Sequence, residues 1–192
     1  MKTKACETEA IIEQVLAEVA ACVRQVSAES LSQAGALVES APLIFVAGAG
    51  RSGLCMRALG MRLMHLGKTV YVVGETTTPS IAVGNLLILG SGSGRTASLL
   101  SMAGQARRQG ANILLFTTEA ESPLAGLADH RVLIPAPSYM TVDGIRSRLT
   151  VQPLGSLFEQ CMLILCDSLI LGLMQRTGIS SEQMAERHAN LE

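Results

Sequence analysis

Five short apolar runs constrain the fold of this chain more than any other feature. They are LIFVA (43–47), TVYVV (69–73), NLLIL (85–89), NILLF (112–116) and RVLIP (131–135). None follows the in–out alternation of a half-buried strand, so we expect both faces of each strand to be covered. Buried strands that alternate with helical stretches form a parallel sheet. The sequence therefore predicts an α/β chain, a three-layer α/β/α sandwich with a five-stranded parallel sheet.

The segments before and after this core have the periodicity of helices. Residues 7–27 place apolar side chains on one helical stripe, which could cover the core or contact another subunit. Residues 30–40 predict a second, short helix, and residues 136–152 lack periodicity and predict a long loop. The expected single domain, residues 1–192, comprises N-terminal helices (1–40), a parallel α/β core (43–135) and C-terminal helices (154–175 and 180–189 within 154–192).

The charge and cysteine patterns narrow the class of protein. A net charge of −1 with 16% charged residues gives no basic footprint for nucleic acid. The five cysteines contain no CxxC pair and lack the ligand spacing of a zinc site, which indicates a reducing, cytoplasmic compartment. Glu7, Glu9 and Glu13 stand where a secretory signal would need an apolar stretch.

The segment 154–174 is apolar enough to be mistaken for a membrane span. Glu159 and Asp167 interrupt it, and charges at that depth are costly in lipid. We therefore expect a buried core or interface helix and no membrane contact.

Two glycine-rich loops follow predicted strands. They are GAGRSG (48–53) and GSGSGRT (90–96), and each precedes a predicted helix. Ligands of open parallel sheets bind beyond the carboxyl ends of the strands. A helix N-terminus with free N–H groups suits an anion, and glycine lets the backbone approach it closely. These two loops predict the binding site.

The first loop also fits the dinucleotide fingerprint G-x-G-x-x-G. A dinucleotide site needs an acidic residue about 20 residues further on to bind the ribose. Glu75 is the candidate, but it follows Gly74 inside a loop instead of ending a strand. Arg51 and Ser52 instead suggest that this loop contributes to an anion-binding site.

The second loop is rich in hydroxyl groups. Ser91, Ser93 and Thr96 supply enough donors to surround a phosphate monoester, although a glycine-rich turn with a serine helix cap would look similar. The predicted binding residues are Gly50, Arg51, Ser52, Ser91, Gly92, Ser93, Gly94 and Thr96, with Glu75 as a contact for sugar hydroxyls.

The S-x-S-G-x-T loop resembles that of the sugar isomerase (SIS) domain family. The segments MRLMHLG, QPLGSLFEQ and RHANLE extend the resemblance over essentially the whole chain, to the 6-phospho-3-hexuloisomerase family. One letter departs from the pattern, because Arg95 stands where related loops commonly have Glu.

This resemblance implies a SIS-type, flavodoxin-like fold and an enzyme without metal or organic cofactor. Its substrate would be a phosphorylated ketohexose: D-arabino-3-hexulose 6-phosphate would convert to D-fructose 6-phosphate through an enediol(ate). The family is typically tetrameric and works after 3-hexulose-6-phosphate synthase in the ribulose monophosphate pathway of formaldehyde fixation. A homotetramer coupled to that synthase is therefore expected.

The reaction needs a group that moves a proton between neighbouring carbons, and Glu159 is our candidate. It stands early on an apolar helix, where an unpaired carboxylate is costly unless it has a function or a partner. Related SIS isomerases place their base at the corresponding position. The alternative is a carboxylate that only complements the helix dipole. Arg51 could neutralise the phosphate or stabilise the enediolate oxygen.

Histidine is a natural partner in proton transfer, and the chain has three. His65 and His188 are equal candidates, because related isomerases borrow a histidine from a neighbouring subunit. We expect His130 to be structural. Two other functions stay open at this point: a non-catalytic SIS module that senses a sugar phosphate, and an isomerase for another phosphosugar.

Overall fold

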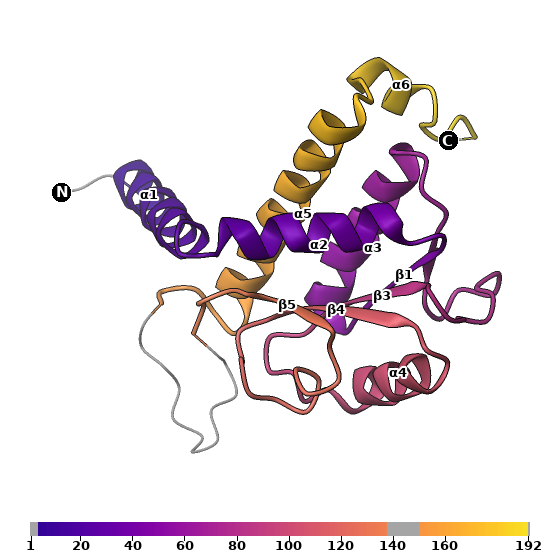
Figure 1. The fold of residues 1–192 in the computed structure, drawn as a ribbon. Coiled ribbons are helices and arrows are strands. Elements are labelled where there is room, and N and C mark those ends of the chain that lie inside the picture. The colour runs from indigo at the N-terminus through magenta and orange to yellow at the C-terminus, as the bar shows by residue number, and fades with distance from the viewer. Residues whose placement is uncertain (1–3, 138–149, 192) are drawn as a thin grey trace.

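A sheet of five parallel strands lies at the centre of the computed structural model, which describes residues 4–137 and 150–191 (Figure 1). The strands are β1 (Ile44–Gly48), β2 (Val70–Val72), β3 (Leu86–Gly90), β4 (Asn112–Thr117) and β5 (His130–Leu133). Their order is β2-β1-β3-β4-β5, and every neighbouring pair is parallel. The five strands predicted from the apolar runs are confirmed.

The three central strands, β1, β3 and β4, are largely buried on both faces. In β1, Ile44 and Val46 belong to one hydrophobic layer, whereas Phe45 and Ala47 belong to the other. Successive side chains of a strand point to opposite faces, so two buried layers require apolar residues at successive positions. The expectation that both faces of every strand are covered is wrong for the edge strand β5, where residues 131 and 133 are exposed.

Helices cover the two faces of the sheet unequally. The helices α2 (Ala28–Ser40), α3 (Gly50–His65) and α5 (Ser156–Thr177) lie on one face, and α4 (Ala97–Arg108) lies on the other (Figure 1). Leu124 and Ala125, from the segment between β4 and β5, complete the layer around α4. The three-layer sandwich is confirmed.

The terminal helices differ in length from the expectation. The N-terminal helix α1 spans Lys4–Val23, and α6 is confined to Ser181–Ala185, where helix was predicted to continue to residue 189. After α6 the backbone tightens, because the N–H groups of Arg187 and His188 bond to carbonyls three residues back. The Arg187 side chain also donates to the His65 carbonyl oxygen at 2.9 Å, which fixes this turn against α3.

The apolar segment that resembled a membrane span is helix α5. Among the described residues it is the one helix long and apolar enough to cross a membrane, and half of that stretch is buried inside the protein. Its buried residues join the hydrophobic layer formed with α3 and the sheet. This agrees with the prediction of a core helix.

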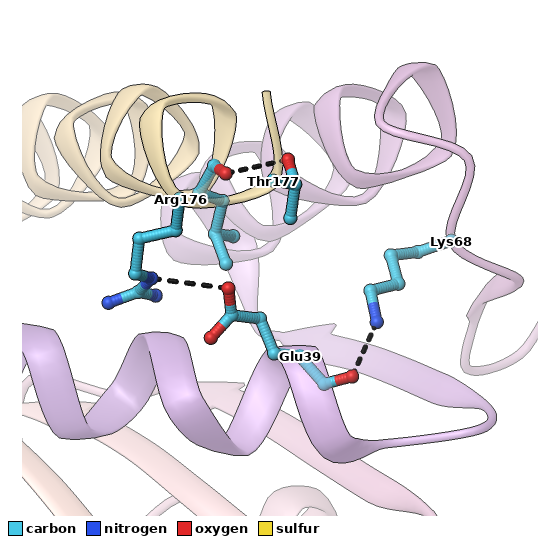
Figure 2. A network of polar contacts seen from close by, with 5 residues as sticks. Glu39, Lys68, Arg176 and Thr177 are labelled. Atoms are coloured by element: carbon cyan, nitrogen blue, oxygen red, sulfur yellow. Dashed lines mark hydrogen bonds and ion pairs between the residues drawn. The ribbon is translucent and has the colours of Figure 1, made fainter. Parts of the chain in front are cut away.

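A polar network joins the ends of three helices on this face. Figure 2 shows Arg176 of α5 reaching Glu39 of α2, with Nε 3.2 Å from Oε1. Lys68, just after α3, donates to the Glu39 carbonyl oxygen at 2.7 Å. The Arg176 guanidinium lies over Gly35, where a Cβ would come within 2.0 Å of it. A larger residue at Gly35 would displace the Arg176 guanidinium from its ion pair with Glu39.

The strand order also creates the place where a ligand can bind. β1 connects through α3 to β2 on one side, while β3 pairs with β1 on the other side and continues into α4. Gly48 and Gly90, the last residues of β1 and β3, are paired across the sheet. Ligands of open parallel sheets bind at such a switch point, because the loops diverge there.

Candidate active site

The loop after β1 is built for close packing of a strand against a helix. A Cβ on Gly53 would lie 2.6 Å from the Gly48 carbonyl oxygen, and Gly50 has a φ of +56°. Helix α3 therefore starts directly at the sheet edge. Its N-cap, Ala49, makes no side-chain capping bond. This end of α3 carries Arg51 and Ser52 in its first turn and has the polarity that favours an anion.

Ser91 organises the loop after β3. Its Oγ accepts a hydrogen bond from the Gly94 N–H at 3.2 Å and lies 3.5 Å from Thr96 Oγ1. Gly94 has a φ of +61°, and a Cβ there would lie 2.0 Å from Ser122 Oγ. Ser91 is buried and holds the turn together. Ser93 and Thr96 are more accessible, so their hydroxyl groups are better placed to reach a ligand.

Two threonines at the end of β4 clamp the same loop, and the sequence analysis missed both. The Gly92 carbonyl oxygen accepts from Thr117 Oγ1 at 2.9 Å and from Thr118 Oγ1 at 3.0 Å. The Thr118 N–H also donates to it at 3.1 Å. The pair of threonines directly after an apolar run was the signal that could have indicated this role.

The start of α5 brings Glu159 to these loops. Glu159 Oε2 lies 2.6 Å from Arg51 Nε, and the Glu159 side chain is only 15% exposed, against 63% for Arg51. Phe158 packs against Gly92, where a Cβ would meet its ring at 3.4 Å. The structure therefore brings Glu159, Arg51 and the loop 90–96 together, as the sequence predicts for these residues.

Cys55 lies beside this pair and was not singled out in the sequence. Its thiol donates to the Glu159 carbonyl oxygen at 3.5 Å. Burial and then the negative charge of Glu159 raise the pKa of the Cys55 thiol, and Arg51 offsets part of this effect. Cys55 is therefore a neutral thiol at neutral pH, one turn of α3 beyond Arg51.

Glu75 follows β2 and is paired with an arginine of α3. Its Oε1 is 2.5 Å from Arg57 Nη1, and both side chains are about half exposed. Glu75 follows β2, which lies next to β1 in the sheet, and Arg57 belongs to α3. A sugar hydroxyl would have to share the Glu75 carboxylate with this arginine.

The two candidate histidines lie together, but at the other end of α3. His65 ends this helix, 14 residues after Arg51, which corresponds to roughly 21 Å along the axis at 1.5 Å per residue. The rings of His65 and His188 stack with their centroids 5.4 Å apart. Within one chain, the structure does not bring either histidine to the Arg51–Glu159 pair.

These histidines line a hollow of about 430 Å³ between α3, α5 and α6. His65 is 3% exposed, whereas His188 is exposed. Burial, and then the positive charges of Arg62 and His188, lower the pKa of His65. His65 is therefore neutral at neutral pH.

His130 has the structural role that was expected of it. Its Nε2 lies 2.8 Å from the Ser30 carbonyl oxygen and 3.1 Å from Ser30 Oγ, which ties β5 to α2. Within residues 4–137 and 150–191, no group of three or more His, Cys, Asp or Glu side chains is arranged to hold a metal ion.

Comparison with known proteins identifies the family of the chain. Residues 37–154, more than half of the chain, match the model of the SIS domain. The chain belongs to the SIS domain family. The matched stretch contains both glycine-rich loops, while α1 and Glu159 lie outside it.

Similar proteins within the SIS family are named as isomerases. The chain is 45% identical to the 3-hexulose-6-phosphate isomerase of Mycobacterium gastri, over 91% of this chain and 86% of the relative. It is 40% identical to the protein of that name in Bacillus subtilis, over 97% of this chain and the whole relative. The expected resemblance to the 6-phospho-3-hexuloisomerase family is confirmed.

A solved structure from Methanococcus jannaschii has the same fold, with a TM-score of 0.82 and 33% identity. The match covers 95% of this chain and 99% of that one, and the function of 3-hexulose-6-phosphate isomerase was inferred for that protein. The SIS-type fold expected from the sequence is confirmed.

Proposed function

We propose that this protein is a 3-hexulose-6-phosphate isomerase, which interconverts D-arabino-3-hexulose 6-phosphate and D-fructose 6-phosphate. The observation that carries the proposal is the Arg51–Glu159 pair, at 2.6 Å, beside a hydroxyl-rich loop at the switch point of the sheet. The names of relatives at 40% and 45% identity support the same reaction.

The phosphate of the substrate would lie against the loop 90–96 and the first turn of α4. Thr96 is the N-cap of α4 and makes no side-chain capping bond, so its hydroxyl group, 3.5 Å from Ser91 Oγ, can also bind a ligand. The helix N-terminus adds N–H donors and a positive dipole end. Ser93 supplies a second accessible hydroxyl, while Ser91 and Thr117 keep the loop in shape.

Glu159 would act as the general base. Its carboxylate removes the proton from C2, and the electrons of that C–H bond form the double bond of a C2–C3 enediolate. The resulting carboxylic acid returns the proton to C3, and the hydroxyl proton moves from O2 to O3, which leaves the carbonyl group at C2. The Arg51 guanidinium, next to Glu159, would stabilise the negative oxygen of the enediolate.

A histidine that assists this proton transfer would have to come from another subunit. The distance along α3 separates both histidines from Glu159 of their own chain. His188 is exposed and His65 is buried beneath it, which favours His188 as the residue that reaches a neighbouring site.

A homotetramer fits the apolar side chains that one copy leaves exposed. Large apolar residues are exposed on α1, α3 and α5: Ile11, Ile12, Leu16, Leu54, Met61, Met64, Leu163, Ile164 and Leu171. Exposed apolar area of this kind marks association surfaces. The proposal also includes a cytoplasmic location and a supply of substrate by 3-hexulose-6-phosphate synthase.

A coupled assay tests the proposed reaction. Ribulose 5-phosphate, formaldehyde and 3-hexulose-6-phosphate synthase supply the substrate, and D-fructose 6-phosphate is measured over time. We expect product at a rate proportional to the amount of this protein, and none when it is omitted. Absence of product with folded protein and a working synthase would overturn the proposal.

A further inference from the structure

The segment that leads into α5 decides where Glu159 stands. Gly155 is the N-cap of α5, and the Glu159 N–H donates to the Gly155 carbonyl oxygen at 3.0 Å. Glu159 therefore lies a single helical turn beyond residues 150–155. Any displacement of this segment is passed on to the first turn of α5.

This segment holds a strained backbone. Leu154 has a φ of +56°, the only positive value of a non-glycine residue in the described parts of the chain, and its side chain is 63% exposed. A leucine adopts this conformation only where surrounding contacts impose it. The Ser156 N–H donates to the Pro153 carbonyl oxygen at 3.1 Å, which closes a turn around Leu154 and Gly155, and residues 150–152 lead directly into this turn.

Residues 150–152, which lead into this turn, all bind Glu18 of helix α1. Its carboxylate accepts from Thr150 Oγ1 at 2.6 Å, from the Val151 N–H at 2.8 Å and from Gln152 Nε2 at 3.2 Å. The Gln152 N–H in turn donates to Thr150 Oγ1 at 3.1 Å. One carboxylate thus binds three successive residues of a segment that is more than 130 positions away in the chain.

The environment of Glu18 agrees with a charged anchor. Burial by itself would raise the pKa of the Glu18 carboxyl, but the hydrogen bonds from Thr150, Val151 and Gln152 outweigh burial and lower it. Glu18 is therefore ionised at neutral pH, and hydrogen bonds to an ionised acceptor are stronger than neutral ones. The next residue, Val19, contacts α5 directly through its carbonyl oxygen, 3.9 Å from Cys161 Sγ.

We infer that Glu18 is a positioning residue for the general base, and that α1 is thereby part of the catalytic apparatus. Glu18 holds residues 150–152, these fix the turn at Leu154 and Gly155, and that turn sets Glu159 against Arg51 of α3. The inference rests on the proposed function of Glu159. It goes beyond the stretch matched by the SIS domain, which begins at residue 37.

The variant Glu18→Gln tests this inference. The amide keeps the shape of the carboxylate, but its NH₂ group cannot accept hydrogen bonds from the donors of residues 150–152. We expect kcat for the hexulose phosphate to fall by about 10- to 100-fold, the loss that a misplacement of about 1 Å causes. The KM should change by less than about threefold, because the phosphate loop is untouched. Glu13→Gln, an exposed site on the same helix, is the matched control and should retain wild-type kcat.

A crystal structure of Glu18→Gln separates positioning from a simple loss of folded protein. It should show a distance between Arg51 Nε and Glu159 Oε2 longer than the 2.6 Å of the wild-type protein. A smaller fraction of active protein would change neither this distance nor the KM.

Wild-type kcat in Glu18→Gln, or an intact Arg51–Glu159 pair in its crystal structure, would overturn the inference that Glu18 positions Glu159. If that variant does not fold, Thr150→Val, which removes one of the three donors, must show a longer distance between Arg51 Nε and Glu159 Oε2 and a smaller loss of kcat with an unchanged KM. If the wild-type protein itself lacks isomerase activity, the proposed function fails, and the crystal structure still decides whether Glu18 positions Glu159.

Discussion

The two ends of helix α3 offer different chemistry. At its amino end, Arg51 pairs with Glu159 beside two glycine-rich loops, and the backbone N–H groups of α3 and α4 point to the same edge of the sheet. At its carboxyl end, His65 and His188 stack over a hollow that both apolar and charged side chains line. The amino end has the features that suit an anionic sugar phosphate.

The polarity of helix α3 contributes to this difference. Carbonyl groups point outward at the carboxyl end of a helix, so that end repels a phosphate. Here the Arg187 side chain already donates a hydrogen bond to the His65 carbonyl oxygen. The amino end combines helix polarity, glycine conformations and hydroxyl groups, and this combination is what binding an anion and moving a proton require.

The largest expected effect is at the amino end. Glu159→Gln should lower kcat by about 10³-fold, because the amide cannot accept the proton from C2. The dissociation constant of D-fructose 6-phosphate, measured by calorimetry, should change by less than about threefold, because the phosphate loop remains. Glu13→Gln, at an exposed position of α1, is the control and should keep kcat within about threefold of wild type. Near-normal turnover in Glu159→Gln would remove Glu159 from the role of base.

The next prediction tests whether the carboxyl end serves another subunit. His188→Ala should lower kcat by about 10²-fold if its imidazole transfers a proton in a neighbouring site. Co-expressing this variant with Glu159→Gln should then restore activity, since mixed oligomers contain sites with both wild-type residues. Wild-type activity in His188→Ala, or no recovery in the mixed oligomers, would confine catalysis to the amino end of one chain.

A smaller effect is expected in the phosphate loop. Ser93→Ala should raise KM about tenfold with little change in kcat, because a lost hydrogen bond to a charged group corresponds to about 1.4 kcal/mol or more. Arg95→Glu is the matched control in the same loop. The Arg95 side chain is exposed, so the KM of Arg95→Glu should stay within about threefold of wild type. An unchanged KM in Ser93→Ala, measured by steady-state kinetics, would contradict the proposed phosphate contact.

The smallest effect concerns stability at the carboxyl end. Because the pKa of His65 is lowered in the folded protein, the unfolded chain binds its proton first, near pH 6.5. The contribution of His65 to stability is complete above that pH and is lost as the pH falls toward the lower folded value, by at most about 1.4 kcal/mol per pH unit. Urea unfolding at several pH values measures how the free energy of unfolding changes with pH. Between pH 7 and pH 5.5 this free energy should change less steeply in His65→Phe than in the wild-type protein. The same slope in both proteins would show that His65 does not cause the pH dependence.

The sequence predicted the parts of this protein that depend on local pattern. Continuous apolar runs such as 85–89 predicted buried strands, since each position must fill one of two hydrophobic layers. The glycines of the two loops were equally informative, because Gly50 and Gly94 adopt positive φ values that other residues avoid. Glu159 could be proposed because a carboxylate near the start of an apolar helix needs a partner.

Contacts between distant segments could not be predicted in the same way. Nothing near Glu18 in the chain shows that its carboxylate binds residues 150–152, and nothing near Thr117 shows that its hydroxyl holds Gly92. The sequence also could not show that His65 and His188 face each other away from Glu159, because the direction in which α3 runs from the sheet decides this.

By itself, the sequence determined the five parallel strands, the two glycine-rich loops and the family to which the chain belongs. Those features follow from the chemistry of neighbouring residues and from similarity to known proteins. Only the tertiary structure decided which side chains meet. Arg51 meets Glu159 because β1 and β3 end side by side and α5 starts above them, and Glu18 meets the segment before α5 because α1 packs across it.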